Sequence, residues 1–457
     1  MSLHYLILCH RSNEQLLDLI KSIYRADDSY ALHVDRKAPR PLALLGQNLA
    51  AKFPNISFVE QRNCSWGGYS LVTATLDAMG SALDASTDWT HFILLSEQHL
   101  PLLPVESLRA CFEASVSYVQ AQSVERMYPN GRADVMHRFA RRYRELEGVG
   151  SFATQRQQPD SKWVSQLFHG SQWIVLSRAA CSYLLDAANP RELWTPFEQS
   201  LLADETAIPT LIMRGVRQGI LKAKDRNATF VAFPSAGGSD DMTFSNDNFF
   251  TARDSGYAFI RKRPTALPDN AQAAWQENLT LAPETIRAFE HCNDAAVAAG
   301  PGPSDDAARK DWTQRLMTLL RLMFPQLSSE LIDQVDHAPK IYLRVRRTAW
   351  RPDVSVCLLS EDLTQFKVLI LWSKPFDGSY DEILFSSFEC PVIRARVYGM
   401  FGLREVVLGE KFNYGFVETP ADMPYIAYMI GQHILACDDF DAQLRAQPDF
   451  QSVKAKC

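Results

Sequence analysis

The stretch that decides the fold is residues 5–35, which read YLILCHRSNEQLLDLIKSIYRADDSYALHVD. Tyr5–Cys9 is a short apolar run of the length typical of a buried strand, and Tyr30–Val34 is a second one. Between them, Asn13 can cap a helix over Glu14–Tyr24, whose apolar residues recur at helical spacing. This strand–helix–strand order is the start of an α/β fold.

The same alternation continues through the next part of the chain. Ile56–Val59 and His91–Leu95 are further predicted strands, and Leu71–Leu83 is a predicted helix. Short strands separated by helices indicate a mainly parallel sheet covered by helices. Such sheets bind ligands outside the carboxyl ends of their strands, where Asp35 and Ser96 stand in this sequence.

A change of composition near residue 300 predicts a domain boundary. Residues 293–306 read NDAAVAAGPGPSDD, which is rich in Ala, Gly, Pro and Asp and lacks apolar periodicity. We therefore expect a first domain over 1–292, a linker over 293–310 and a smaller C-terminal α/β domain over 311–457. In the last domain the predicted elements are helices over Trp312–Phe324 and Tyr425–Ala436 and strands at Ile341–Val345, Val354–Leu359, Phe366–Trp372, Val392–Tyr398 and Val406–Leu408. It holds no catalytic motif, and its role is unknown.

The composition of the 457 residues narrows the class of protein. Hydrophobic residues make up 46% and charged residues 22%, which is ordinary globular usage and excludes bulk disorder. A net charge of -6 gives no reason to expect nucleic acid as a partner. Nine cysteines without a CxxC pair indicate reduced thiols. Since no signal peptide or transmembrane stretch is evident, we expect a cytoplasmic protein, free or peripheral to a membrane.

Six segments of the first domain form an ordered set of motifs. They are HVDRKA at 33–38, WGGYSLV at 66–72, LLSEQHLP at 94–101, HGSQW at 169–173, DETAIPT at 204–210 and YAFIRK at 257–262. Together they resemble the core-2/I-branching glycosyltransferases, a family of β-1,6-N-acetylglucosaminyltransferases and peptide O-xylosyltransferases, in a bacterial-type member. The resemblance spans about residues 4–270. It implies a GT-A fold and transfer of N-acetylglucosamine or xylose, with inversion, from a UDP-sugar to a hydroxyl of a glycan or other acceptor.

Such a transfer needs a base for the acceptor's proton and positive charge for the departing diphosphate. Glu205 is the candidate base, because its apolar neighbours would desolvate it partly and raise its pKa toward working pH. Asp204 is the less favoured carboxylate. The alternative is that both residues stand at an exposed helix N-terminus, where acidic side chains are favoured by the helix dipole alone.

Arg261 and Lys262 are the candidates for the diphosphate, since both side chains are common phosphate ligands. The resemblance implies that Lys262 replaces a metal ion on the leaving group, so no metal or other cofactor is expected. The alternative is a basic surface turn before Pro264.

The remaining donor contacts follow from the resemblance. It implies that Asp35 accepts from the uracil ring N–H, with His10 and Val34 lining the same end, although an Asp after a strand is also an ordinary turn former. Trp66, Gly67 and Gly68 are expected to bring backbone close to the donor, because glycine permits an approach that a Cβ would block. Ser171 and Gln172 offer polar side chains near the donor sugar, and Trp173 is either core or an apolar platform for the acceptor.

Several positions depart from the family pattern. His99 stands where an Asp is usual, Ile260 replaces an Ala, and Arg263 replaces a Phe. Residues 232–241 lack the aromatic–His–Pro signature and the second basic residue for the diphosphate, for which Arg253 or Arg261 would have to substitute. These departures favour an alternative function, a weak or inactive nucleotide-sugar or glycan-binding protein. A glycoside hydrolase is a further rival, but it needs a second acid near Glu205 and does not explain Lys262.

Metal and nucleotide fingerprints give no competing assignment. No Asp-x-Asp pair follows the strand at 91–95, and the one at Asp439–Asp441 lies near the C-terminus. Asp240 and Asp241 are best described as a glycine-flanked acidic loop. The sequence has no GxGxxG fingerprint and no P-loop, so a dinucleotide oxidoreductase or an NTPase lacks support.

Overall fold

The chain divides into two compact units in the computed structural model. The first comprises Met1–Phe152 and Gln157–Pro301, and the second comprises Ala153–Arg156 and Gly302–Cys457. The structure describes residues 2–85, 88–127, 138–139, 141–146, 150–156, 161–186, 191–232, 243–300, 306–323, 331–337, 340–345, 353–359, 365–376, 379–387, 390–399, 402–408 and 417–420.

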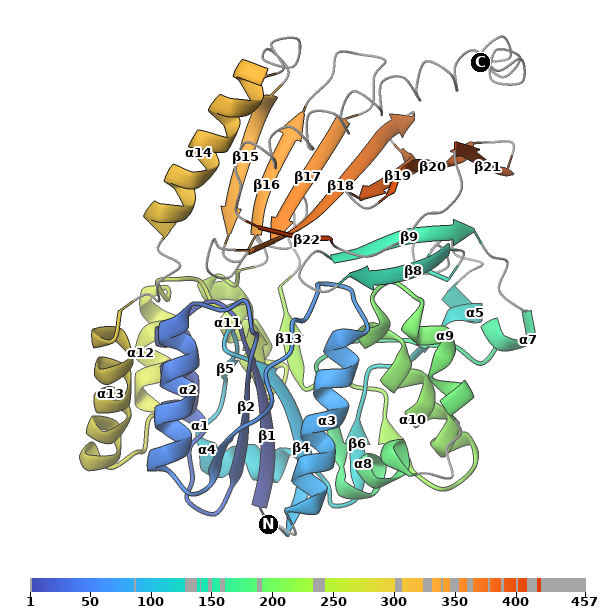
Figure 1. Ribbon diagram of the computed structural model, residues 1–457. Coiled ribbons are helices and arrows are strands. Elements are labelled where there is room, and N and C mark those ends of the chain that lie inside the picture. Colours follow the sequence, from blue (N-terminus) through green and yellow to red (C-terminus); the bar gives the residue numbers. More distant parts are fainter. Residues whose placement is uncertain are drawn as a thin grey trace. The chain divides into compact units, whose positions relative to one another are not determined.

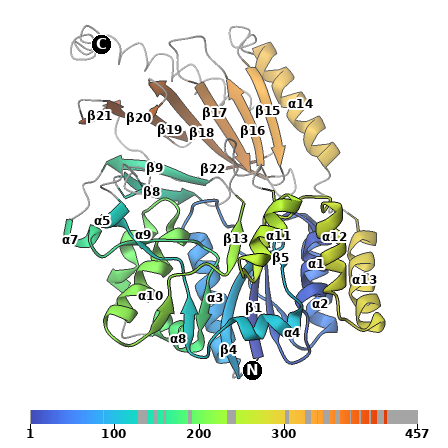
Figure 2. The same cartoon turned by 180° about the vertical axis from the view of Figure 1, so that it is seen from behind.

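A seven-stranded, mostly parallel sheet forms the centre of the first unit (Figures 1 and 2). Its order is β12-β6-β11-β4-β1-β2-β3, and β11 is antiparallel to both of its neighbours. The strands are β1 (Ser2–Cys9), β2 (Ser29–Val34), β3 (Ile56–Phe58), β4 (Trp89–Ser96), β6 (Val116–Tyr118), β11 (Val175–Ser177) and β12 (Lys222–Lys224). The predicted mainly parallel sheet is confirmed, because β4, β1, β2 and β3 pair in parallel.

Helices cover both faces of this sheet. One core cluster joins it to α1 (Asn13–Ile23), α2 (Arg40–Lys52) and α13 (Pro283–Ala298), and the other joins it to α3 (Ser70–Asp84), α8 (Arg178–Leu185) and α10 (Ala207–Arg217). Alternate residues of β1 serve the two clusters: Leu3, Tyr5, Ile7 and Cys9 pack on the first side, and Leu6 and Leu8 on the second. A strand buried on both faces must be apolar throughout, which explains the uninterrupted run at 5–9.

A small three-stranded sheet lies beside the main one. Its order is β13-β14-β5, with β13 at Thr229–Val231, β14 at Phe259–Arg261 and β5 at Leu100–Pro101. Strand β5 follows the turn after β4 directly and pairs antiparallel with β14. This pairing brings the 94–101 and 257–262 motifs together.

Shorter elements complete the described part of the first unit, and one of them, β9, continues into the second unit from Ala153 on. They are α4 (Val105–Leu108), β7 (Gln122–Ser123), α5 (Val124–Met127), β8 (Arg141–Leu146), β9 (Gly150–Arg156), α7 (Ser161–Val164), β10 (Phe168–His169), α9 (Thr195–Glu198), α11 (Asn246–Asp254), α12 (Asp269–Glu277) and 3-10 turns at Arg109–Cys111, Arg191–Leu193 and Ala203–Glu205.

The cap of α1 differs from the prediction by one residue. Ser12 has an extended backbone and its hydroxyl accepts from the Gln15 N–H, as an N-cap does. Asn13 instead donates from its side chain to the carbonyl of Pro41 and to Asn293 Oδ1. The expected cap was wrong because Asn13 is engaged by α2 and α13.

The predicted linker is also largely helical. Helix α13 continues to Ala298, and α14 begins at Asp306, so only a short segment separates them. Alanine is the best helix former, and the Ala-rich composition that suggested a linker therefore extends the helix. Phe289, Cys292 and Ala296 are buried at helical spacing, which attaches α13 to the first unit.

The second unit contains an eight-stranded sheet and helix α14 (Asp306–Met323). Its order is β15-β16-β17-β18-β19-β20-β21 with β22 paired to β18, and every recorded pairing is antiparallel. The strands are β15 (Leu331–His337), β16 (Lys340–Val345), β17 (Asp353–Leu359), β18 (Gln365–Phe376), β19 (Ser379–Ser387), β20 (Cys390–Gly399), β21 (Gly402–Leu408) and β22 (Val417–Pro420). The predicted helix Tyr425–Ala436 lies outside the described residues.

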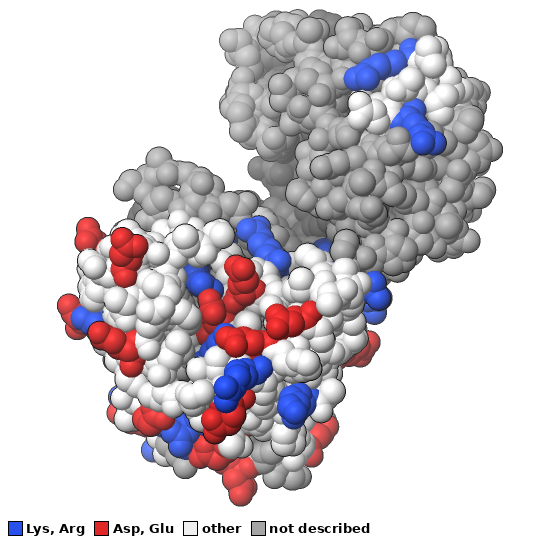
Figure 3. All heavy atoms as spheres, turned by 90° about the vertical axis from the view of Figure 1, so that its left-hand side faces the viewer, with Lys and Arg blue, Asp and Glu red and all other residues white. Residues whose placement is uncertain are grey.

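The surface of the first unit carries mixed charge. In Figure 3 acidic and basic side chains are interspersed over its visible face. Ion pairs such as Lys21 with Glu290 (3.0 Å), which joins α1 to α13, explain part of this pattern. Within the described ranges, no helix has the length and apolar character needed to cross a membrane.

The docking of α13 yields a stability prediction. Phe289 is fully buried and stacks on Phe53 with 4.3 Å between ring centroids. Phe289→Ala should lower the free energy of unfolding by about 3–5 kcal/mol, because it leaves a cavity beside Phe53 and Tyr24, where α13 packs on α2 and α1. Val297 on the same helix is 55% exposed, and Val297→Ala should change it by no more than about 0.5 kcal/mol. Urea titrations would measure both, and equal effects would show that α13 is not part of the core.

Candidate active site

The carboxyl ends of β1, β2 and β4 meet at one edge of the sheet. The Asp35 N–H donates to the Cys9 carbonyl (2.8 Å), and the Glu97 N–H donates to the Leu8 carbonyl (3.2 Å). The strand ladders thus continue one residue past β2 and β4. They fix the start of the turns that carry Asp35 and Glu97, next to His10 at the end of β1.

Glu97 was not among the predicted site residues, although it lies inside the 94–101 motif. Its side chain is completely buried, and Oε1 accepts from the backbone N–H groups of His10 and Arg11, each at 2.9 Å. The Nδ1 atom of His10 lies 3.1 Å from the same oxygen. Burial alone would raise the pKa of Glu97, but the contacts with His10 and Arg11 outweigh it and lower the pKa. Glu97 is therefore ionised.

Asp35 is already engaged by the protein. Its carboxylate pairs with Lys37 Nζ (2.9 Å) and accepts from the N–H groups of Lys37 (2.8 Å) and Cys64 (3.1 Å). These are the bonds of a turn former, which was one of the two alternatives for this residue. Val34 is fully buried in the core, so only its backbone is available to a ligand.

The WGG loop contacts the loop that carries Glu205. Gly67 has a φ of 71°, and its carbonyl accepts from the Leu202 N–H at 2.8 Å. Leu202 has a φ of 53°, a left-handed conformation that costs a non-glycine residue roughly 1–3 kcal/mol. The hydrogen bond helps to hold that conformation. Trp66, beside it, is 71% exposed.

Gly68 is packed against Glu145 of β8, where an added Cβ would overlap the carboxylate. Glu145 accepts from the N–H groups of Ser65 (3.1 Å) and Ser70 (2.8 Å) and from the Ser70 hydroxyl. A carboxylate at this position stabilises the first turn of α3. Contacts within the protein thus constrain Gly67 and Gly68, and their approach to the donor stays a prediction.

Glu205 lies at the end of the 3-10 turn and is held by two side chains. Arg138 Nη1 lies 2.7 Å and His169 Nε2 lies 3.2 Å from Glu205 Oε2. Burial would raise the pKa of Glu205, but the hydrogen bond from His169 and the charge of Arg138 outweigh it and lower the pKa. The expectation of a raised pKa was therefore wrong, because it omitted these partners. The side chain remains 33% exposed.

Asp204 has the opposite environment. It is 8% exposed, and its Oδ1 has no hydrogen-bond partner among the described residues. Burial and the charge of Glu205 raise the pKa of Asp204 to about 7. Neighbouring carboxylates with separated pKa values are typical of sites where acid and base roles are divided.

The turn at 169–173 supports Glu205 through its backbone. The Gly170 N–H donates to the Glu205 carbonyl at 2.8 Å, and a Cβ on Gly170 would overlap the carbonyl of Gln120. The hydroxyl of Ser171 accepts from the Trp173 N–H at 3.1 Å, whereas Gln172 is half-buried. Gly170 and Ser171 therefore shape the turn.

Trp173 belongs to the core and forms a stack with two polar residues. It is 8% exposed, with the Arg261 guanidinium 4.0 Å from its ring centroid and the His99 ring 4.5 Å away at 68°. The structure thus favours the core role for Trp173 over an acceptor platform. His99 is fully buried, and its Nδ1 accepts from the Ser96 N–H at 2.9 Å. Burial and the charge of Arg261 lower the pKa of His99, so the ring is neutral.

Arg261 is a half-buried cation. Its Nε is buried without a hydrogen-bond partner in the described part of the chain. Burial lowers the pKa of Arg261 to about 10, against the opposing charges of Glu97 and Asp204. Arg261 therefore stays protonated at neutral pH and couples electrostatically to both carboxylates.

The other basic candidates differ in exposure and partners. Lys262 is half-buried, and its carbonyl accepts from the Phe244 N–H at 3.1 Å. Arg263 is buried and pairs with Asp18 of α1 at 2.7 Å, so it is a structural residue.

Arg253 lies on α11, where it stacks on Phe250 (4.7 Å) and lies 3.5 Å from Asp254. Its partners on the helix surface give no support to the suggestion that it replaces a missing diphosphate ligand.

These motifs thus lie close together in the first unit, and five of the six fall within the part of the chain that a known family matches. The family model described as Core-2/I-Branching enzyme matches residues 3–252, which is more than half of the chain. The chain belongs to the core-2/I-branching enzyme family.

Curated relatives from this family match part of the chain. A xylosyltransferase of Ciona intestinalis is 28% identical over 219 residues, which are 46% of this chain and 24% of the relative. A xylosyltransferase of Drosophila melanogaster is 27% identical over 217 residues, 45% of this chain and 24% of the relative. A β-1,3-galactosyl-O-glycosyl-glycoprotein β-1,6-N-acetylglucosaminyltransferase of Mus musculus is 24% identical over 227 residues, 47% and 48% of the two chains. The chain thus spans about a quarter to a half of these relatives.

The described residues include no cluster of metal-ligating side chains. No group of three or more His, Cys, Asp or Glu side chains there is placed to hold an ion. The pairs Asp240–Asp241 and Asp439–Asp441 lie outside the described residues, as does most of the 232–241 departure from the family pattern.

The contact at Gly170 predicts the effect of a single methyl group. Gly170→Ala should destabilise the first unit by about 1–3 kcal/mol, because the new Cβ must displace the Gln120 carbonyl or the turn. Gly80→Ala is the matched control. Gly80 lies inside α3, and the only atom within 4 Å of an added Cβ would belong to Leu185, at 3.8 Å. That change should be neutral or stabilising by up to about 1 kcal/mol. Urea unfolding measures both, and a harmless Gly170→Ala would contradict the close approach.

Proposed function

We propose that the chain is an inverting, metal-independent glycosyltransferase with a GT-A fold. It would transfer N-acetylglucosamine or xylose from a UDP-sugar to a hydroxyl of a glycan or other acceptor. The observation that carries the proposal is the partly exposed, ionised Glu205 in the same unit as the cations Arg261 and Lys262. Family membership and the names of the relatives support the reaction class and the two sugars.

In the proposed step, the acceptor oxygen attacks the anomeric carbon while the bond from that carbon to the diphosphate breaks. The hydroxyl proton passes to Glu205, and the bonding electron pair leaves with UDP. Glu205 suits the role of base because it is ionised and positioned by Arg138 and His169. Asp204 is less suited, because its carboxylate is buried and its Oδ1 is inaccessible.

The leaving diphosphate requires positive charge. Lys262 is the proposed direct ligand, since its side chain is half-buried rather than enclosed. Arg261 is stacked on Trp173 and acts as a fixed charge behind the site. These two cations would take the place of a metal ion, and a metal is therefore not required by the proposal.

The nucleotide is proposed to lie along the carboxyl edge formed by β1 and β2. Asp35 is the proposed partner of the uracil N–H, because its two carboxyl oxygens have lone pairs beyond those used by Lys37 and Cys64. His10, whose side chain is 45% exposed, lies at the same edge. The exposed indole of Trp66 offers an apolar face to a sugar.

A non-catalytic nucleotide-sugar or glycan-binding protein is the second candidate function. It is favoured by the ion pair of Glu205 with Arg138, which reduces the basicity of the carboxylate. The presence of His99 in place of an Asp gives this second candidate less support, because His99 is buried in the core. A glycoside hydrolase is disfavoured, because the neighbouring acid Asp204 is buried rather than presented to a substrate.

The reaction class is tested by donor binding and product formation. UDP, UDP-N-acetylglucosamine and UDP-xylose should each be titrated calorimetrically in excess EDTA, with glycan acceptors then added for product detection. We expect binding to persist in EDTA and to weaken as salt rises, because charge–charge contacts are screened. A strict Mn²⁺ requirement would contradict metal independence, and binding without transfer would favour the second candidate function.

The assignment of the base is tested by two isosteric variants. Glu205→Gln keeps the shape but cannot accept the proton, so transfer should fall by about 10²–10⁴-fold while donor binding barely changes. Asp204→Asn should have a much smaller effect on the chemical step.

The pH profile separates the same two residues. Only an ionised base can accept the proton, so activity is lost as pH falls through the pKa of the base. With Asp204 as base, kcat/KM would fall through about pH 7. With Glu205 as base, it should persist below the ordinary range of a glutamate, because that pKa is lowered. An acid limb near 7 in the wild type would refute Glu205.

A further inference from the structure

We propose that Glu97 is a positioning residue that fixes two parts of the donor site relative to each other: the His10–Arg11 turn after β1 and the guanidinium of Arg261. The inference rests on the proposed function. It assigns a role to a residue of the 94–101 motif that the sequence analysis left without one.

The contact with the turn after β1 is made by one oxygen. Glu97 Oε1 receives the N–H groups of His10 and Arg11 and lies within hydrogen-bond distance of His10 Nδ1. Three donors converging on a fully buried carboxylate leave the turn little freedom. A ligand that binds at the carboxyl end of β1 therefore contacts a backbone whose conformation is fixed by its hydrogen bonds to Glu97.

Glu97 is linked to Arg261 by the interaction of their charges and by backbone hydrogen bonds between the segments that carry them. Glu97 Oε2 is buried and, among the described residues, has no hydrogen-bond partner, as is also true of Arg261 Nε. The charge of Glu97 is the largest one that opposes the effect of burial on Arg261. The turn that carries Glu97 is joined to the Arg261 strand by the β5–β14 pairing and by the Arg263 N–H, which donates to the Gln98 carbonyl at 2.9 Å.

A buried charge is costly unless it is paired and hydrogen-bonded. Glu97 is hydrogen-bonded to the turn after β1, and its charge balances the cation of Arg261. Glu97→Gln separates these two functions. The amide oxygen can still accept from His10 and Arg11, but the negative charge that balances Arg261 is lost.

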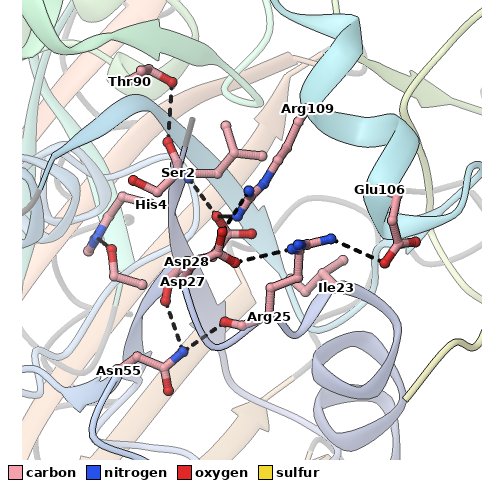
Figure 4. A network of polar contacts seen from close by, with 12 residues as sticks. Ser2, His4, Ile23, Arg25, Asp27, Asp28, Asn55, Thr90, Glu106 and Arg109 are labelled. Atoms are coloured by element: carbon pink, nitrogen blue, oxygen red, sulfur yellow. Dashed lines mark hydrogen bonds and ion pairs between the residues drawn. The ribbon is translucent and has the colours of Figure 1, made fainter. Parts of the chain in front are cut away.

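Asp28 provides a matched control, because it contacts the amino end of β1 whereas Glu97 contacts the turn at its carboxyl end (Figure 4). It too is a buried carboxylate that accepts from the backbone, in this case from the N–H of Leu3 in β1 at 2.7 Å, and it pairs with Arg109 at 2.5 Å. Figure 4 shows this network among Ser2, Asp27, Asn55 and Arg109, at the amino end of the sheet. Asp28→Asn therefore makes the same chemical change to a similar contact, away from the proposed donor site.

The experiment measures UDP affinity by calorimetry and the donor KM and kcat for the full chain. Glu97→Gln should weaken UDP binding about tenfold and raise the donor KM more than it lowers kcat. The reason is that Arg261 and the His10–Arg11 turn are then no longer held in position by one charged side chain. Asp28→Asn should lower the melting temperature with affinity and KM changed less than about twofold. In an Arg261→Gln background, the further effect of Glu97→Gln should shrink to about twofold or less, because the two act as one unit.

Wild-type UDP affinity and donor KM in a folded Glu97→Gln protein would overturn the inference. It would also be overturned if Glu97→Gln weakened UDP binding as much in the Arg261→Gln background as in the wild type. If Glu97→Gln fails to fold, Glu97→Asp keeps the charge but shortens the reach, and wild-type UDP affinity in that variant would likewise overturn it. A wild-type protein that binds no UDP or UDP-sugar would instead refute the proposed function. The two failures are therefore distinguishable.

Discussion

The constraint on which the rest of the first unit depends is the buried carboxylate of Glu97. It is satisfied by backbone N–H groups at the end of β1, and its turn continues directly into β5, which pairs with β14. Because a buried charge cannot lose its partners cheaply, the ends of β1, β4 and β14 are fixed together. The predicted nucleotide edge and the basic residues 261–262 thus share one support.

Much of the fold could be predicted from the sequence because burial on both faces makes a parallel strand a continuous apolar run. The runs at 5–9, 30–34 and 91–95 each lie inside an observed strand for this reason. The errors arose where local composition has two physical explanations. An Ala-rich segment suits a linker or a helix, and only the burial of Cys292 and Ala296 decides for α13. Ser12 and Asn13 are both good N-caps, and tertiary contacts of Asn13 decide between them.

The sequence motifs predicted which residues of the candidate site to examine, but they did not predict the distant side chains that bind and position those residues. Arg138 is 67 residues from Glu205 along the chain, and Glu145 is 75 residues from Ser70. No local pattern links such pairs, so neither the ion pair nor its effect on the pKa of Glu205 could be inferred. At glycines 67, 68 and 170 an added Cβ would meet other groups of the protein, and the sequence does not show which groups these are. A motif shows which residues matter without showing which atoms they touch.

The Asp204–Glu205 pair shows how the backbone assigns chemistry to adjacent, nearly identical side chains. In a 3-10 turn, successive side chains point about 120° apart, so one can enter the core while the next reaches the rim. The left-handed Leu202, held by Gly67, sets the start of this turn, and the Gly170 N–H holds its end. Asp204 consequently meets a dry interior that favours its neutral form, whereas Glu205 meets Arg138 and His169, which favour its ionised form. Opposite pKa shifts in neighbouring carboxylates are thus a property of the turn, and the glycines of two motifs are what permit that turn.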